Sequence, residues 1–333
     1  MSLRTPYLMF LGDAADQLAA KTAAGVAHWR PNWCIGQLRL EDCHADLGLP
    51  DLTLEEAAAR GVKTVIIGVA NRGGKISESW TRTLVRAIEL GMDLASGLHN
   101  KLSDVPAIAE AAKRHGRLLA DVRHPTREYP VASGVPRSGH RVLTVGTDCS
   151  VGKMFTSLAL EREMLARGLP ATFRATGQTG ILIAGDGLSV DAVVADFISG
   201  SIEVLSPAAD PDHWDLIEGQ GSLFHPSFAG VSLGLLHGAQ PDALVMCHEP
   251  TRAHMRGVPG YALPSLEACI EGNLAAGRLT SPAVRCVGVS INTAALPAAE
   301  AKALLELTAD RLGLPAVDAV RTGVGPLVDK LLG

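Results

Sequence analysis

Residues 146–153 read GTDCSVGK and directly follow a run of branched apolar residues, RVLTV at 141–145. A strand, a glycine-containing loop and a Gly-Lys pair at a helix start are typical of a phosphate-binding loop, because backbone N–H groups curl round the anion and the lysine reaches over it. Five residues separate Gly146 from Gly152, one more than is usual. An ordinary glycine-rich turn is the alternative, but strand, loop and helix agree on a phosphate site. The predicted cofactor-binding residues here are Gly146, Thr147, Cys149, Ser150, Val151, Gly152, Lys153 and Met154.

Met154 follows the lysine, where P-loop enzymes that cleave Mg-nucleotides have Ser or Thr to coordinate the metal. Thr156 and Ser157 are displaced from that corner by about 200° and 300° around the helix. We therefore expect a loop that holds phosphates without a bound metal ion. Coenzyme A is such a ligand, because acyl transfer leaves its diphosphate and its 3′-phosphate intact.

The first third of the chain alternates short apolar runs with helical patterns, which predicts strands at 7–12, 33–38, 63–69 and 93–97. This rhythm predicts a Rossmann-like open sheet. The segment GDAAD at 12–16 lacks the glycine fingerprint of dinucleotide sites, which argues against an NAD site.

A stretch rich in Pro, Ser and Gly lies between 123 and 141 and reads as a crossing between domains. A second series of strand patterns follows it, at 141–145, 171–175, 214–218, 242–247 and 284–291. The predicted fold class is therefore α/β: an N-terminal Rossmann-like open sheet in residues 1–130, then a C-terminal P-loop NTPase-like parallel sheet with flanking helices in residues 131–333.

The net charge of −5 and a pI of about 6.1 give no general basic field, which argues against a nucleic-acid partner. The N-terminal segment does not read as a signal peptide, and no apolar stretch reaches the length of a membrane span. The six cysteines are scattered without a C-x-x-C pair, which predicts reduced thiols, a cytoplasmic protein and no Cys/His metal site. Small-molecule substrates are the expected partners, and the many small apolar residues leave room for a homo-oligomer.

The loop closely resembles that of dethiobiotin synthetase, a P-loop ligase with the same five-residue spacing. The segments EGQG at 218–221 and GVSIN at 288–292 resemble that enzyme's acidic segment and its strand ending in an adenine-reading asparagine. The resemblance implies a shared fold from about residue 141 onward and assigns Asn292 to cofactor binding. That family requires Mg-ATP and has Thr after its lysine, so Met154 argues against a ligase mechanism here.

A second resemblance covers nearly the whole chain, to the D-glutamate N-acetyltransferase (DgcN-like) family, long known only as a domain of unknown function. The segments that carry it are WRP at 29–31, GVANRGG at 68–74, SGLH at 96–99, ATGQTG at 175–180, EGQGSLFHP at 218–226, HGAQPDALV at 237–245, CHEP at 247–250 and GVGPLVD at 323–329. The resemblance implies transfer of acetyl from acetyl-CoA to the amine of D-glutamate or a similar acidic amino acid. Acetyl-CoA is then the co-substrate, and no metal is expected.

Such a reaction needs cations for two carboxylates and donors for the oxyanion. Arg72, in an Asn-Arg-Gly-Gly loop, and Arg174, at a strand end, are the better candidates for the carboxylates, with surface ion pairs as the alternative. Gln178 and Thr179 lie between two glycines after a strand and could supply the oxyanion donors. His248 closes another apolar strand and completes the predicted substrate-binding set. The sequence does not show which domain holds the amino acid; a cleft between the domains is expected.

The reaction also needs a base. Glu218 ends an apolar strand, where open α/β sheets place their ligands, with a structural carboxylate as the alternative. His225 follows in the next loop, and a packed or hydrogen-bonded histidine is its alternative. Asp148 would repel a phosphate unless it points outward, where it could face the acceptor amine. These three residues are the predicted catalytic set.

Three alternatives stay open. Cys149 suggests a covalent acetyl-cysteine, since loop N–H groups and Lys153 would lower its pKa, but direct transfer is simpler for an amine acceptor. The chain could also be an ATP-dependent ligase or kinase of the dethiobiotin synthetase type, or a non-catalytic nucleotide or CoA sensor.

Overall fold

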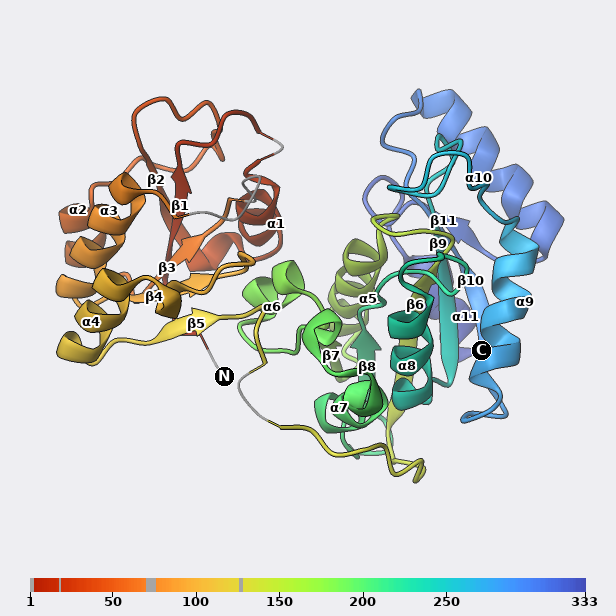
Figure 1. The fold of residues 1–333 in the computed structure, drawn as a ribbon. Helices are drawn as coiled ribbons and strands as arrows, with labels where there is room; N and C mark the ends of the chain where they lie inside the picture. The colour runs from red at the N-terminus through yellow and green to blue at the C-terminus, as the bar shows by residue number, and fades with distance from the viewer. Residues whose placement is uncertain (1–2, 18, 70–75, 126–127) are drawn as a thin grey trace. The chain divides into compact units, whose positions relative to one another are not determined.

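The computed structural model describes residues 3–17, 19–69, 76–125 and 128–333 (Figure 1). By its internal contacts the chain forms two compact units. Unit 1 contains residues 1–126 and 177–192, and unit 2 contains residues 127–176 and 193–333. The segment 177–192 thus belongs with unit 1, whereas the sequence pattern had assigned it to the second domain. Its helix α6 (Gln178–Ala184) packs against α1 (Lys21–Trp29), an interaction that no local pattern reveals.

Unit 1 is built on a five-stranded parallel sheet in the order β2-β1-β3-β4-β5. Its strands are β1 (Tyr7–Gly12), β2 (Cys34–Arg39), β3 (Thr64–Ile67), β4 (Asp93–Ser96) and β5 (Leu119–Asp121). All residues of β1, β3 and β4 are buried, as expected for strands with helices on both faces. The remaining helices of the unit are α2 (Leu54–Ala59), α3 (Glu78–Glu89) and α4 (Pro106–His115).

Local sequence signals explain where these helices begin or end. Thr53 and Glu56 form a reciprocal capping box at the start of α2. The Ser77 side chain accepts the Trp80 N–H at the start of α3, and Gly116 ends α4 in the left-handed conformation.

Unit 2 contains a six-stranded parallel sheet in the order β11-β10-β9-β6-β8-β7. Its strands are β6 (His140–Gly146), β7 (Ala171–Arg174), β8 (Trp214–Ile217), β9 (Ala243–His248), β10 (Arg285–Ile291) and β11 (Ala316–Val317). Its helices are α5 (Lys153–Ala166), α7 (Ile198–Leu205), α8 (Ala229–Ala239), α9 (Leu266–Gly277), α10 (Ala298–Leu312) and α11 (Gly325–Leu332). Two parallel sheets with flanking helices confirm the predicted α/β fold class.

Strand order shows where each sheet is suited to bind a ligand. In unit 1 the connections from β1 and β3 leave in opposite directions, and in unit 2 those from β6 and β9 do so. Ligands of open α/β sheets lie at the carboxyl ends of the strands at such points. In unit 2 this position is occupied by the loop 146–153, between the ends of β6 and β9.

Candidate functional site

The loop between β6 and α5 has the backbone of an anion-binding turn. Ser150 and Gly152 adopt positive φ angles of 53° and 104°, and Gly152 is the N-cap of α5. Positive φ at these positions gives the tight turn that leads into α5, which adds the positive end of its dipole. The N–H groups of Thr147 and Cys149 are bonded within the protein, to the Cys247 carbonyl and the Asp148 carboxylate. The loop therefore has the local geometry of a phosphate site.

Lys153 begins α5 and lies almost wholly inside the protein, 6% exposed. Its Nζ donates to the carbonyl oxygens of Asp148, at 2.8 Å, and Gly221, at 2.7 Å. Burial lowers the pKa of Lys153, which the nearby Cys247, Cys149, Asp148 and Glu218 partly oppose. Two carbonyl oxygens are weaker partners than a phosphate, so an anion in the loop can draw this ammonium away from them.

The two hydroxyl groups of α5 are already bonded within the protein. Thr156 bonds the carbonyl of Gly152 and the hydroxyl of Ser290, and Ser157 bonds the hydroxyl of Thr144. Both residues are buried, whereas Met154 is half-buried beside the lysine. No hydroxyl on the first turn of α5 thus replaces the metal-coordinating Ser or Thr that other P-loops have there.

Asp148 is fully buried, and its carboxylate is bonded within the protein. Its Oδ2 accepts from Arg252 Nη1 at 2.7 Å and from the Arg256 N–H at 2.9 Å, and its Oδ1 accepts from the Cys149 N–H at 2.6 Å. Burial opposes its ionisation, but these hydrogen bonds outweigh burial and hold the pKa of Asp148 below its usual value. The carboxylate is ionised and engaged by three donors.

His225 is equally buried, at 1% exposed, and both ring nitrogens have backbone partners. Its Nδ1 accepts from the Ser227 N–H at 3.1 Å, so Nε2 carries the proton and donates to the Arg256 carbonyl at 3.0 Å. The ring also lies 4.6 Å from that of Phe228. These bonds hold the ring in place and fix the segment that carries Arg256.

Glu218 follows β8 directly and is 5% exposed. Its Oε2 accepts from the Thr176 N–H at 3.0 Å, and its backbone carbonyl accepts from the Thr176 hydroxyl at 2.5 Å. Glycine is required at the next position, because a Cβ on Gly219 would lie 1.7 Å from the Thr144 carbonyl oxygen and 3.0 Å from Lys153 Cδ. The backbone after Glu218 is therefore pressed against the lysine stem and the end of β6.

The ends of β9 and β10 form the other side of the site. Thr147 Oγ1 lies 2.9 Å from His248 Nδ1, and the Asn292 N–H donates to the His248 carbonyl at 2.8 Å. Burial lowers the pKa of His248, so the ring favours its neutral form. Asn292 itself is exposed, and a Cβ on Gly152 of the phosphate loop would lie 4.0 Å from its Cβ.

Two arginines that sequence reasoning missed lie over the phosphate loop. Arg252 donates to the carbonyl oxygens of Cys149, at 2.5 Å, and Ser150, at 2.8 Å, and Arg256 Nη1 donates to the Ser150 hydroxyl. They come from the segment after β9, more than 100 positions away in the chain. The available signal was the pair of arginines in TRAHMR at 251–256, directly after a predicted strand.

Cys149 does not have the environment of a reactive thiolate. Burial raises its pKa, although Lys153, Arg256 and Arg252 work in the other direction. The expected lowering of this pKa is therefore wrong, since desolvation of the thiol outweighs the cations around it.

Arg174 lies at the end of β7, but its guanidinium is directed to the neighbouring strand. Its Nε donates to Asp215 Oδ1 at 2.7 Å, and Asp215 also accepts from the Ser206 hydroxyl. The arginine is thus part of a partly buried ion pair within the sheet of unit 2.

The remaining predicted substrate residues are in unit 1 or outside the described chain. Gln178 and Thr179 begin α6, and a Cβ on Gly97 would lie 2.6 Å from Gln178 Oε1. This buried oxygen has no hydrogen-bond partner among the described residues. Arg72 lies outside the described residues.

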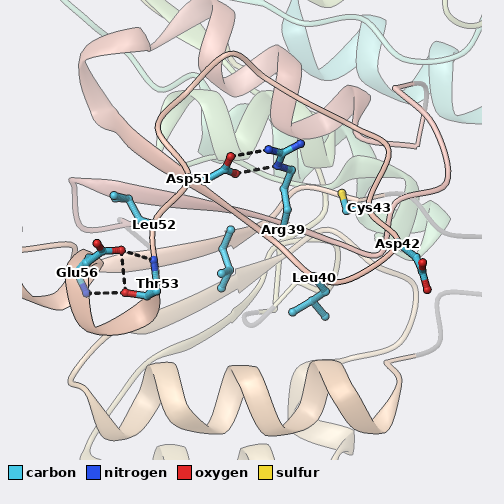
Figure 2. A pocket seen from close by; sticks show the side chains of 9 residues that line it. Arg39, Leu40, Asp42, Cys43, Asp51, Leu52, Thr53 and Glu56 are labelled. Carbon is cyan, nitrogen blue, oxygen red and sulfur yellow. Dashed lines mark hydrogen bonds and ion pairs between the residues drawn. The ribbon is translucent and has the colours of Figure 1, made fainter.

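Unit 1 also has an open pocket of about 440 Å³ at the end of β2 (Figure 2). Four of its polar side chains are paired: Arg39 donates to both oxygens of Asp51, at 2.8 and 2.5 Å, and Glu56 accepts from the Thr53 N–H and hydroxyl. Asp42 and Cys43 also line the pocket.

The described residues contain one group with the spacing of metal ligands: donor atoms of Asp148, Cys149 and His225 lie within 4.8 Å of one another. The residues do not fit a cation, because three N–H donors occupy the Asp148 carboxylate and both His225 nitrogens have backbone partners. Arg252 also brings a positive charge to the same carboxylate.

Within the described residues, every helix is too short or too polar to cross a lipid bilayer.

Comparison with known proteins shows two family matches. Residues 130–328 match the P-loop domain DUF1611 (DUF1611_C) and residues 38–125 match the Rossmann-like domain DUF1611_N, both described as domains of unknown function. A solved structure of a DUF1611 family protein from Anabaena variabilis is 31% identical, with a TM-score of 0.86 over 99% of each chain.

Two curated relatives extend over the full length. A protein of Tritonibacter scottomollicae named D-glutamate N-acetyltransferase is 59% identical over 329 residues, 99% of this chain and of the relative. One of the same name from a Pseudoalteromonas species is 48% identical over 331 residues, 99% of this chain and 100% of the relative.

Proposed function

We propose, from the premise that this chain belongs to the DUF1611 family, that it is an N-acetyltransferase that acts on D-glutamate with acetyl-CoA as the donor. Both curated relatives carry the name of that activity and match over essentially their whole length. The single structural observation that supports the donor is a phosphate loop with a buried lysine, Lys153, and no hydroxyl after it.

In the proposed reaction the neutral amine of D-glutamate attacks the thioester carbon of acetyl-CoA. A C–N bond forms and the C–S bond breaks; the amine loses a proton to a base, and the departing thiolate gains one. The products are N-acetyl-D-glutamate and the free thiol of CoA. The protein must supply the base, donors for the oxyanion and charge for the phosphates.

The phosphate loop is the proposed site of the CoA diphosphate. The N–H groups of the loop, the dipole of α5 and Lys153 together favour an anion. An uncleaved diphosphate needs no metal ion to polarise it, which explains why Met154 can follow the lysine. Asn292 at the end of β10 is the proposed contact for the adenine.

Glu218 is our choice for the base among the three predicted catalytic residues. It follows β8 at the ligand edge of the sheet, and its charge acts on Lys153. Asp148 and His225 are engaged by three and two hydrogen bonds respectively, and we assign them to positioning the loop segments around the site.

The candidate contacts for the amino acid are Gln178, Thr179 and Arg72 in unit 1. In unit 2 they are His248 and, as the weaker candidate, Arg174. The buried Gln178 Oε1, with no partner among the described residues, is suited to accept a hydrogen bond from the substrate amine, a role different from the oxyanion donor expected from the sequence. Arg174 is the weaker candidate, since one of its nitrogens is bound to Asp215.

The test is to incubate the purified protein with acetyl-CoA and D-glutamate, measuring thiol release and N-acetyl-D-glutamate by mass spectrometry, with L-glutamate as the matched acceptor. We expect thiol release that requires D-glutamate. Magnesium-dependent formation of ADP from ATP and a small acid would instead indicate a ligase, and tight CoA binding without turnover on any amino acid would indicate a sensor. Either result would overturn the proposal.

We also propose a cytoplasmic location and a homo-oligomer. All six cysteines are free thiols, in agreement with a reducing compartment. Light scattering coupled to size-exclusion chromatography tests the oligomer, and a single-chain mass of about 34.8 kDa would contradict it.

A further inference from the structure

The segment from Glu249 to Ser265, here called the β9–α9 loop, is held in a defined shape. Met255 in its middle is 2% exposed, and the Met255 N–H donates to the Tyr261 carbonyl at 2.9 Å. His254 and Ala262 form an antiparallel bridge that closes the turn. A buried anchor and a bridge give this loop a fixed base on which side chains can be oriented.

Asp148 ties the β9–α9 loop to the phosphate loop. The carboxylate receives one bond from the Arg252 side chain and one from the Arg256 backbone N–H. In Arg256 this bond uses only the backbone N–H. It therefore places Arg256 at the phosphate loop independently of the Arg256 side chain.

Arg252 and Arg256 differ in whether a carboxylate balances their charge. Arg252 pairs with Asp148 at 2.7 Å and with Glu249 at 3.0 Å, and it also binds two loop carbonyls. Arg256 is exposed, its Nη1 donates to the Ser150 hydroxyl, and it has no carboxylate partner among the described residues. Arg252 therefore links the two loops, while Arg256 brings a positive charge without a carboxylate partner among the described residues to the phosphate loop.

We propose that Arg256 binds the diphosphate of the cofactor, as the second cation of the phosphate loop beside Lys153. In P-loop enzymes that use Mg-nucleotides, a metal ion supplies the second positive charge. Here Met154 cannot hold that ion, and the guanidinium at Ser150 takes its place. Arginine is suited to this role, because its planar fork can donate two bonds to phosphate oxygens. The inference rests on the proposed function for the identity of the cofactor, but not for the presence of a phosphate.

The experiment compares Arg256→Ala with wild type by calorimetric titration in EDTA, using CoA, 3′-dephospho-CoA and ADP as probes. Arg278→Ala is the matched control, since Arg278 is an exposed arginine at the end of α9. We expect Arg256→Ala to weaken all three probes by a similar factor, about tenfold to a hundredfold, and Arg278→Ala to change none. Arg256→Lys, which keeps the charge but loses the fork, should be intermediate.

Each outcome decides a separate question. Unchanged CoA binding in Arg256→Ala overturns the inference and leaves the proposed function intact. A loss confined to CoA overturns the assignment to the diphosphate, since only CoA carries the 3′-phosphate. If the wild type binds ADP but not CoA, and Arg256→Ala weakens ADP binding by the expected factor, the inference stands and the proposed function fails. Wild type that binds no probe overturns both.

Discussion

Arg252 Nη1 lies 2.7 Å from Asp148 Oδ2, and this ion pair joins two loops that are more than 100 residues apart in the chain. The carboxylate is fully buried, while the arginine side chain is 22% exposed. A residue inside the phosphate loop thus binds one of the protein's own cations, which offsets the negative charge that it brings to the loop.

Replacing Asp148 with Asn should destabilise the protein by about 3 kcal/mol, because it leaves Arg252 without its buried partner. The loss is at the low end of the range for buried pairs, since Arg252 keeps Glu249 and some contact with water. Chemical denaturation measures it. Asp212→Asn, at an exposed carboxylate, should stay within about 0.5 kcal/mol of wild type, and equal effects of the two changes would contradict the buried-pair argument.

His248 should make the stability of the fold depend on pH. Burial places its folded pKa below the ordinary value of 6.5, so the unfolded chain takes up the proton first. The stability that His248 contributes is fully present above pH 6.5 and is lost as the pH falls through its folded pKa. His248→Asn should therefore flatten the decline in unfolding free energy between pH 7 and 5. His44→Asn changes an exposed histidine and should keep the wild-type dependence of unfolding free energy on pH. If His248→Asn also keeps it, the prediction is wrong.

Gly219→Ala should lower the free energy of unfolding by about 3 kcal/mol and abolish CoA binding. The new methyl would clash with the Thr144 carbonyl oxygen and press against the Lys153 side chain. Gly230→Ala is the matched change: nothing lies within 4 Å of its added Cβ, and the residue is in α8. In that variant the free energy of unfolding should rise by up to about 1 kcal/mol, because alanine favours the helix more than glycine does. Thermal unfolding with and without CoA distinguishes the two, and comparable melting temperatures would mean that the backbone at Gly219 is not tightly packed.

Cys149→Ser should retain acetyl transfer. Burial raises the pKa of this thiol, so the thiolate needed for a covalent intermediate is disfavoured. Intact mass spectrometry of the wild type after brief exposure to acetyl-CoA should show no acetylated protein. An acetylated form that disappears on addition of D-glutamate, together with an inactive serine variant, would establish the covalent route.

Removal of metal ions should leave acetyl transfer unchanged, because Met154 after the lysine offers magnesium no hydroxyl and the Thr156 hydroxyl is bonded to Gly152 and Ser290. Met154→Thr restores the hydroxyl found in Mg-nucleotide enzymes, and magnesium should then tighten ADP binding in this variant alone. Met154→Leu keeps an apolar side chain and serves as the control. Magnesium-dependent ADP binding by the wild type would count against the interpretation of the loop.

The phosphate loop could be predicted because its strand, its glycines and its lysine are contiguous in sequence. Its partners could not: Arg252 and Arg256 reach it only because β9 lies beside β6, and strand order is a property of the assembled sheet. The same limit applies to Arg174, whose role depends on Asp215 in the neighbouring strand. His225 looked like a candidate base because a sequence cannot reveal that both ring nitrogens are engaged by the backbone.

The two shortest strands, β5 and β11, were missed altogether, since runs of two or three residues carry little periodicity.

The polypeptide leaves unit 2 after Thr176, supplies α6 to unit 1, and returns at Val193. A recombination event with one breakpoint near residue 130 would therefore separate unit 1 from one of its own helices and leave that helix as a foreign insertion in the other half. Such an arrangement resists the exchange of modules between genes, and it favours inheritance of both halves together as one evolutionary unit.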